Sequence, residues 1–202
     1  MQKAKRTKTK DELMTSAKNI LIQDGHEVLT VRKLSEVTGF SHTSLYYYFS
    51  DLQHLLWELR ISMIEDMIQE LSLPTSSMTD PVSEIIEAFT RYADYFIEHP
   101  TVFRFFYFHA FQEPENDNRF RQLEQRFQGM WHSSFTRLIL DGVIELENLE
   151  TVATSMIYMV QGLLLLSFQS NKTQLDIHRE ITNCFRYLLE SQLKKGEIHE
   201  KS

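Results

Sequence analysis

The sequence contains few of the residues that turn-rich folds and glycine-based sites require. Six glycines and four prolines are few for 202 residues, and strand-rich folds need many turn residues, so we do not expect an all-β fold. The closest two glycines, Gly129 and Gly142, are 13 positions apart. This spacing excludes the glycine motifs of nucleotide-binding loops and of serine-hydrolase elbows.

Metal-binding patterns are also missing from the sequence. Cys184 is the only cysteine, so the chain has neither an internal disulfide nor a thiolate cluster, and we expect it in a reducing cytoplasm. The eight histidines are never closer than 10 residues, and none follows a glutamate by three positions, so short helical metal motifs are absent. We therefore expect no metal, no cofactor and no catalysis, with an unrecognised enzyme site as the alternative.

One uncharged segment, 151–171, is long enough to span a bilayer. Eight serine, threonine, glutamine and asparagine residues dilute it, so it better suits a helix buried in protein. The basic N-terminus is not followed by an apolar signal core. We expect no membrane partner.

Charge is divided unevenly along the chain. The formal net charge is −7, but residues 1–60 hold 9 basic and 7 acidic side chains, which gives +2 and leaves −9 for residues 61–202. Five basic residues precede the first acidic one, and they are Lys3, Lys5, Arg6, Lys8 and Lys10. This basic N-terminal arm is either a solvated terminus or a segment that lies along DNA.

Apolar spacing and capping residues predict four helices before residue 72. A helix over about 10–24 has one buried face, formed by Leu13, Ala17, Ile20 and Leu21. Thr30 caps a short helix that Gly39 ends, and Ser41 caps a second short helix. A longer helix follows over about 51–71. The side chains expected in the core of the short helices are Leu34, Val37, Leu45 and Phe49. Two short helices joined by a glycine turn and packed on a first helix are typical of a DNA-binding helix-turn-helix.

The segment Thr30–Leu56, TVRKLSEVTGFSHTSLYYYFSDLQHLL, closely resembles the DNA-binding region of the tetracycline-repressor (TetR) family of bacterial regulators. The resemblance covers roughly residues 10–60 and includes the patterns T-V-R-x-L-x-x-x-x-G and S-x-x-x-L-Y-x-Y-F. It implies that the second short helix enters the major groove of double-stranded DNA. It also implies that a helical C-terminal body forms a homodimer and binds a small-molecule effector.

The residues expected to contact DNA lie on and beside the two short helices. Hydroxyl and imidazole groups on the first turn of the second short helix can reach base edges, and the resemblance assigns phosphate or base contacts to the tyrosines. Consecutive residues on a helix are about 100° apart, so the three tyrosines cannot all share the buried face of Leu45 and Phe49. The predicted contacts are Thr30, Arg32, Lys33, Ser41, His42, Thr43, Ser44, Tyr46, Tyr47 and Tyr48.

One position departs from the family pattern. Where the family usually has a lysine at the start of the fourth helix, this chain has Leu52 after Asp51. The change removes a cation and adds an anion beside the expected phosphate backbone, which predicts weaker backbone affinity unless the N-terminal lysines compensate.

The rest of the chain reads as further amphipathic helices. We expect them over about 81–98, 101–112, 117–141, 149–170 and 174–194, after a polar joint from Pro74 to Pro81. The predicted fold is all-α with about nine helices. It comprises a helix-turn-helix DNA-binding domain with a basic arm over residues 1–55 and a helical effector-binding and dimerisation domain over residues 56–202.

Aromatic residues are concentrated in the predicted C-terminal body. A densely packed core explains any single one of them best, but as a group they predict an apolar effector pocket. The candidate pocket residues are Trp57, Tyr92, Phe96, Phe103, Tyr107, His109, Phe127, Trp131, Phe135 and Met159.

The helix expected over about 149–170 is apolar on nearly all sides, which is more apolar surface than one partner helix hides. This predicts a dimer, and the resemblance to the family implies that the last two helices pack against their two-fold mates. The candidate interface residues are Met156, Leu163, Leu166, Ile181, Phe185 and Leu188.

The sequence thus predicts a ligand-responsive DNA-binding transcriptional regulator. We expect it to be a repressor that a small, largely apolar effector releases from a palindromic operator. The alternatives are a helical carrier or sensor of lipophilic molecules with degenerate DNA binding, and an unrecognised helical enzyme.

Overall fold

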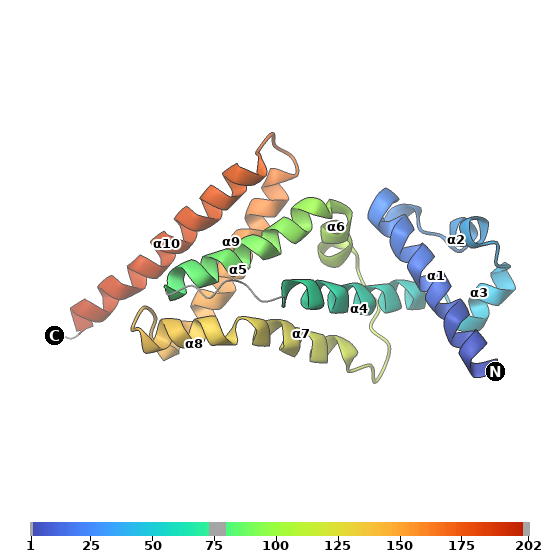
Figure 1. The fold of residues 1–202 in the computed structure, drawn as a ribbon, viewed down its shortest axis with the longest axis horizontal. Helices are drawn as coiled ribbons and strands as arrows, with labels where there is room; N and C mark the ends of the chain where they lie inside the picture. The colour runs from blue at the N-terminus through green and yellow to red at the C-terminus, as the bar shows by residue number, and fades with distance from the viewer. Residues whose placement is uncertain (1, 73–79, 200–202) are drawn as a thin grey trace. The chain divides into compact units, whose positions relative to one another are not determined.

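The computed structural model describes residues 2–72 and 80–199, with side chains described for 8–72 and 80–192, and this part of the chain contains helices and no strand (Figure 1). The predicted joint from Pro74 to Pro81 lies mostly outside the described residues. The α-helices are α1 (Gln2–Asp24), α2 (Val31–Thr38), α3 (His42–Tyr48), α4 (Leu52–Leu71), α5 (Pro81–Glu98), α6 (Pro100–Phe108), α7 (Arg119–Met130), α8 (His132–Leu140), α9 (Leu149–Ser167) and α10 (Gln174–His199). Two 3₁₀ turns, η1 (His26–Val28) and η2 (Leu146–Asn148), precede α2 and α9.

The helices form two compact units. Unit 1 contains the residues up to Ile68 together with His99–Glu124, and unit 2 contains Gln69–Glu98 together with the residues from Gln125 onward. The boundary expected between residues 55 and 56 separates a DNA-binding domain from an effector-binding domain. It is a division by function and not by compactness, and it stays a prediction.

Unit 1 is built around α1, which contacts η1, α2 and α6. Its predicted buried face is confirmed, since Leu13, Ala17 and Leu21 are fully enclosed and Ile20 is buried. The Thr101 hydroxyl of α6 donates a hydrogen bond of 2.8 Å to the carbonyl of Ile22 near the end of α1. The α1 helix is therefore the element on which η1, α2 and α6 assemble, and α3 packs on α2.

Local capping chemistry sets the two short helices. The Thr30 hydroxyl accepts a hydrogen bond of 3.0 Å from the amide of Lys33, and the Ser41 hydroxyl accepts one of 3.1 Å from the amide of Ser44. Between them, Gly39 has φ +73° and ends α2, a left-handed conformation that glycine adopts without a steric cost. The predicted helix-turn-helix is confirmed.

Two N-terminal expectations are wrong. The first helix was expected to begin at about residue 10, but α1 already begins at Gln2, so the basic residues of the arm belong to this helix. Their contact with DNA stays a prediction. Lysine, arginine, alanine and glutamine favour helix, and neither glycine nor proline interrupts them. Val37 was expected in the core but is 55% exposed, because α2 is only about two turns long and Leu34 alone faces α1.

Unit 2 is centred on α5, which contacts α8, α9 and α10. Its inward face consists of Ile85, Ile86, Phe89, Tyr92, Ala93, Tyr95 and Phe96, all buried. The Asp94 carboxylate ties α5 to α10, because it accepts a hydrogen bond of 2.7 Å from Gln174 Nε2 and lies 2.5 Å from His178 Nε2. The apolar face of α5 is thus the core of this unit.

Two helix boundaries differ from the sequence expectation. The helix expected over 101–112 ends at Phe108, and the side chains of His109 and Phe111 instead pack against aromatic rings of unit 1. The helix expected over 117–141 is divided into α7 and α8 at Trp131, whose amide makes a tighter turn to the carbonyl of Gln128. Gly129 lies next to this break, and glycine weakens a helix interior. The described chain therefore has ten α-helices rather than about nine.

By length and composition alone, the helical stretch Leu146–Ser167 would suit a membrane crossing, and 22% of that window is buried within the chain. In unit 2, α9 contacts α5 and α10 through one side, formed by Val152, Met156, Val160, Leu164 and Ser167. Tyr158, Leu165 and Leu166 lie on its exposed side. The exposed side of α9 is therefore apolar as well.

Gly39→Ala tests the turn between α2 and α3. The added Cβ would meet no atom within 4 Å, so the expected loss of about 1 kcal/mol in the free energy of unfolding comes from the left-handed backbone conformation alone. Urea denaturation measures this change. Gly129→Ala is the matched control, because Gly129 also has open space but no positive φ, and we expect no loss there. Equal effects of the two substitutions would contradict the account.

Candidate nucleic-acid interface and aromatic clusters

The α3 helix is buried by one side only. Leu45 and the following Phe49 are buried, whereas Tyr46 and Tyr47 are 55% and 63% exposed. The remaining predicted contacts on this helix divide in the same way: Ser41, His42 and Thr43 are exposed, and Ser44 and Tyr48 are half-buried. The structure thus brings the predicted contacts of α3 to one accessible surface.

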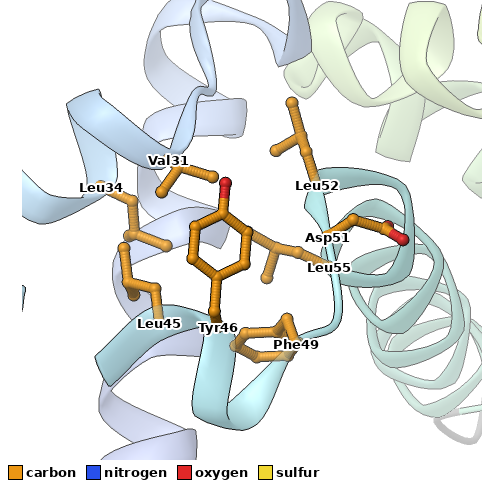
Figure 2. A pocket seen from close by; sticks show the side chains of 8 residues that line it. All are labelled: Val31, Leu34, Leu45, Tyr46, Phe49, Asp51, Leu52 and Leu55. Atoms are coloured by element: carbon orange, nitrogen blue, oxygen red, sulfur yellow. The ribbon is translucent and has the colours of Figure 1, made fainter. Parts of the chain in front are cut away.

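Tyr46 lies over the junction of three helices. Figure 2 shows its ring among the side chains that line a small pocket, which are Val31 and Leu34 of α2, Leu45 of α3, Phe49 just after α3, and Asp51, Leu52 and Leu55 at the start of α4. The ring of Tyr46 is therefore placed by packing while its hydroxyl group remains available to a partner.

A second hollow lies between α1 and α3. It is lined by Thr9, Phe40, Ser41, Thr43, Ser44, Tyr47 and Tyr48. The rings of Tyr47 and Tyr48 meet edge to face at 5.1 Å between centroids, which fixes the direction of both side chains. Hydroxyl groups dominate this hollow, and a hydroxyl can both donate and accept hydrogen bonds.

The predicted contacts on α2 include an ion pair that the sequence analysis missed. Arg32 Nε donates a hydrogen bond of 2.9 Å to Glu36 Oε1, one helical turn later. The pair raises the pKa of Arg32 and lowers the pKa of Glu36 through that hydrogen bond and the opposite charge. The spacing of four residues between an arginine and a glutamate was the available signal. Thr30 is exposed and Lys33 is half-buried.

The departure from the family pattern at the start of α4 has a structural explanation. Asp51 Oδ1 accepts a hydrogen bond of 2.7 Å from the amide of His54 and so caps α4, where a negative charge is favourable. Leu52 is half-buried and lines the pocket under Tyr46 (Figure 2). These two residues therefore fix the end of α4 that follows α3.

The predicted pocket residues fall into two clusters, one in each unit. The unit 1 cluster contains Trp57, Phe103, Tyr107 and His109. Trp57 is 1% exposed and its Nε1 donates a hydrogen bond of 2.7 Å to Asp117 Oδ2, while the rings of Phe103 and Tyr107 lie 4.8 Å apart.

The unit 2 cluster contains the other six residues, Tyr92, Phe96, Phe127, Trp131, Phe135 and Met159. Trp131 stacks on Phe89 at 4.7 Å, and its ring lies 5.6 Å from that of Phe127. Trp131 Nε1 is buried without a hydrogen-bond partner among the described residues. Phe135 is buried and Met159 is half-buried. Whether any of these side chains contacts an effector stays a prediction.

A chain of charged groups links α1, α4 and the start of α7. Lys10 Nζ lies 2.9 Å from Glu58 Oε2, and Arg119 pairs with both Glu58 and Asp117. Hydrogen bonds from Arg119 are the main cause of a pKa of Asp117 well below its usual range. Burial raises the pKa of Glu58, but hydrogen bonds from Arg119 and Lys10 outweigh it and lower the pKa overall. We call these four residues the ion network. Lys10 was singled out from the sequence only as part of the basic N-terminal arm, and Glu58, Asp117 and Arg119 were not identified.

Two histidines meet beneath α6. The rings of His26 and His109 lie 5.0 Å apart, and both contact Phe105. Nδ1 of His26 and Nε2 of His109 are buried without a hydrogen-bond partner in the described chain, although His26 Nδ1 is 3.3 Å from the Glu27 carboxylate. Burial lowers the pKa of His109, the positive charges of His26 and Arg60 lower it further, and Glu27 acts in the opposite direction. The fold therefore favours a neutral His109.

The predicted interface residues differ in accessibility. Met156, Ile181 and Phe185 are enclosed by their own chain, Leu163 and Leu188 are half-buried, and Leu166 is 64% exposed. A fully enclosed side chain supports a surface from below and does not itself touch a partner. The exposed apolar surface of α9 and α10 consists instead of Tyr158, Leu165, Leu166, Leu175 and Tyr187.

Solved structures with the same fold are transcriptional regulators. Neither a protein-family model nor a curated protein matches the sequence. The chain is similar to RolR in complex with resorcinol, with a TM-score of 0.67 and 15% identity over 94% of this chain and 89% of that one. It is also similar to PfmR, a TetR-family transcriptional regulator from Thermus thermophilus, with a TM-score of 0.62 and 16% identity over 89% and 95% of the two chains. For a regulator of the TetR/AcrR family from Thermobifida fusca, the TM-score is 0.59 and the identity 12%, over 90% and 97%. The chain therefore has the fold of TetR-family transcriptional regulators, which confirms the expected all-α class.

Replacing His109 by glutamine tests the histidine pair. Because the pKa of His109 is lowered in the fold, the unfolded chain takes up the proton first as the pH falls below about 6.5. The stabilising effect of neutral His109 is thus present above that pH and lost as the pH falls through the lower folded pKa. We expect wild-type stability, measured by urea denaturation from pH 7.5 to 5.5, to fall more steeply than that of His109→Gln. Equal slopes for the two proteins would contradict this assignment.

Proposed function

We propose that the chain is a dimeric, ligand-responsive transcriptional regulator that binds a palindromic DNA operator. The observation that carries the proposal is the one-sided burial of α3, which leaves His42, Thr43, Tyr46 and Tyr47 exposed and Ser44 and Tyr48 half-buried. Hydroxyl, imidazole and phenol groups on a helix that protrudes this way suit contacts to base edges and phosphates in a major groove. The family fold supports the same use of α3.

The α2 helix and the first turns of α1 are proposed to contact the DNA backbone. Lys8 is exposed near the start of the described side chains, and Thr30 is exposed just before α2. The side chain of Arg32 is exposed as well, but it must exchange Glu36 for phosphate on binding, so its net contribution to affinity is smaller than that of an unpaired arginine. Backbone contacts of this kind position the protein without reading sequence.

The dimer is proposed to form through the exposed apolar surface of α9 and α10. Tyr158, Leu166 and Tyr187 are 68%, 64% and 78% exposed in the single chain, and large apolar side chains exposed on neighbouring helices suit a protein contact. A two-fold pair would present two α3 helices about 34 to 36 Å apart to successive major grooves, which explains why we expect a palindromic operator.

The effector is proposed to be a small, largely apolar molecule that releases the protein from DNA, and the regulator to act as a cytoplasmic repressor without enzymatic activity. The similar RolR structure contains resorcinol, a small aromatic compound. Within unit 1, a molecule that moved Trp57 or Asp117 would act on Arg119 and Glu58 and hence on Lys10 of α1. The ion network thus offers a physical route from an aromatic cluster to the helix that supports α2 and α3.

Selection of DNA fragments by the purified protein tests operator binding. We expect the selected sequences to converge on a near palindrome. Tyr47→Ala should weaken binding to that sequence about tenfold, because a lost base contact typically costs about 1–3 kcal/mol. Phe108→Ala, which removes another exposed aromatic ring outside α3, is the control and should leave binding unchanged. Selection without convergence would favour a carrier or sensor instead.

Sedimentation of Leu166→Glu tests the dimer surface. A glutamate placed in an apolar interface leaves a buried charge without a partner, so we expect the dimer to dissociate at micromolar concentration. Leu140→Glu is the matched control, since Leu140 of α8 is 78% exposed and outside the proposed surface. The proposal is contradicted if Leu166→Glu sediments as the wild type does.

A further inference from the structure

Arg60 of α4 has its cationic head enclosed by aromatic rings. Its Cζ atom lies 4.0 Å from the ring centroid of Phe120, 4.2 Å from that of Phe111 and 5.7 Å from that of Trp57. These rings come from α7, from the segment between α6 and α7, and from α4 itself, and together we call them the aromatic cage. All three distances are within the range of a cation–π interaction.

The aromatic rings take the place of an ion-pair partner for Arg60. Nε of Arg60 is buried without a hydrogen-bond partner, and no carboxylate of the described chain lies within ion-pair distance of the guanidinium. A partly buried arginine is normally paired with a carboxylate that accepts its hydrogen bonds. Burial accordingly lowers the pKa of Arg60, with the charges of Glu124 and Glu113 acting in the opposite direction. The structure thus holds the Arg60 cation against ring faces, while its buried Nε has no hydrogen-bond partner in the described chain.

The aromatic cage has supports other than Arg60. Trp57 is fixed by its hydrogen bond of 2.7 Å to Asp117, which Arg119 holds in turn. The Trp57 ring also contacts Phe111 and Phe120 directly, at 6.3 Å and 5.9 Å between centroids. The Trp57 wall and its contacts with the other two rings therefore have supports other than the arginine.

The charges around the aromatic cage favour a cation over an anion. Glu113 and Glu124 act on Arg60 from the segment before α7 and from α7, and Asp117 accepts the indole hydrogen bond at one wall. An anion brought here would meet ring faces, which carry negative charge density, and nearby carboxylates. Arg60, Phe111 and Phe120 are half-buried, so the site also meets solvent.

We propose that the aromatic cage is a binding site for an organic cation with a quaternary ammonium or guanidinium head, and that Arg60 is its resident occupant, which such a ligand displaces. This inference rests on the proposed function in one respect, because it takes the organic cation to be the effector of the proposed regulator. Quaternary ammonium groups bind to several ring faces at once and need no hydrogen-bond acceptor. Arg60, in contrast, leaves its buried Nε without an acceptor in this position, which makes it a replaceable occupant.

Occupation of the aromatic cage by a ligand has a direct structural consequence. The walls belong to the same elements as the ion network, because Trp57 is bonded to Asp117 and Glu58 follows Trp57 in α4. If a ligand displaced Arg60 and moved Phe111, the positions of Asp117 and Arg119 would change. Because Arg119 pairs with Glu58, and Glu58 pairs with Lys10, the change would also reach Lys10 on α1.

Calorimetric titration of the full chain with choline tests the proposal. Arg60→Ala empties the aromatic cage, so we expect it to bind choline at least tenfold more tightly than the wild type. The neutral isostere 3,3-dimethylbutan-1-ol should bind Arg60→Ala at least tenfold more weakly than choline does, because only the charge differs. Adding Phe120→Leu to Arg60→Ala should lower choline affinity at least fivefold. Arg60→Met is the second variant that removes the cationic head. The methionine side chain retains the apolar packing of the arginine stem.

The proposal is overturned if the emptied cage binds choline no better than the wild type, or if the neutral isostere binds equally well. Operator binding measured on the same samples separates the two proposals. Failure of choline binding with intact DNA binding contradicts only the cage, and choline binding without DNA binding contradicts only the proposed regulator function.

Discussion

The proposed activity depends on the fact that only one side of α3 is buried. Leu45 and Phe49 anchor this helix of seven residues, and its remaining side chains have no room beneath it. Three consecutive tyrosines therefore cannot be hidden, and the capped turn at Gly39 and Ser41 sets the direction in which they project. A short helix that depends on two apolar anchors and two caps is stable only on a formed scaffold, and α1 provides that scaffold.

The ion network and the aromatic cage connect elements of unit 1 that are far apart in the sequence. Polar contacts join α1 to α4 and α4 to the segment before α7, across separations of 48 to 61 residues. Arg60 lies beside this network without taking part in it. The same short segment, 109–118, supplies His109, Phe111 and Asp117, so one irregular stretch of chain carries the histidine pair, one wall of the cage and the anchor of Trp57. The position of this segment is thus coupled to several groups that can respond to a ligand or a proton.

Local chemistry explains which features the sequence could predict. Thr30, Gly39 and Ser41 act within four residues of themselves, and the apolar spacing of α1 depends only on helix geometry, so both were found. The contact of Trp57 with Asp117 joins residues 60 positions apart and leaves no periodic trace. The exposure of Val37 and the early end of α6 depend on which neighbours fill the core, and composition does not specify that. The predicted pocket residues were likewise chosen by type, and the fold separates them into two clusters.

The central claim is that the outer side of α3 enters a major groove, and methylation interference on the selected operator tests it most directly. Methyl groups at guanine N7 project into the major groove, whereas those at adenine N3 lie in the minor groove. The account predicts interference by N7 methylation in two half-sites about 10 base pairs apart, on one face of the duplex. Interference confined to adenine N3, or none at guanine N7, would contradict it.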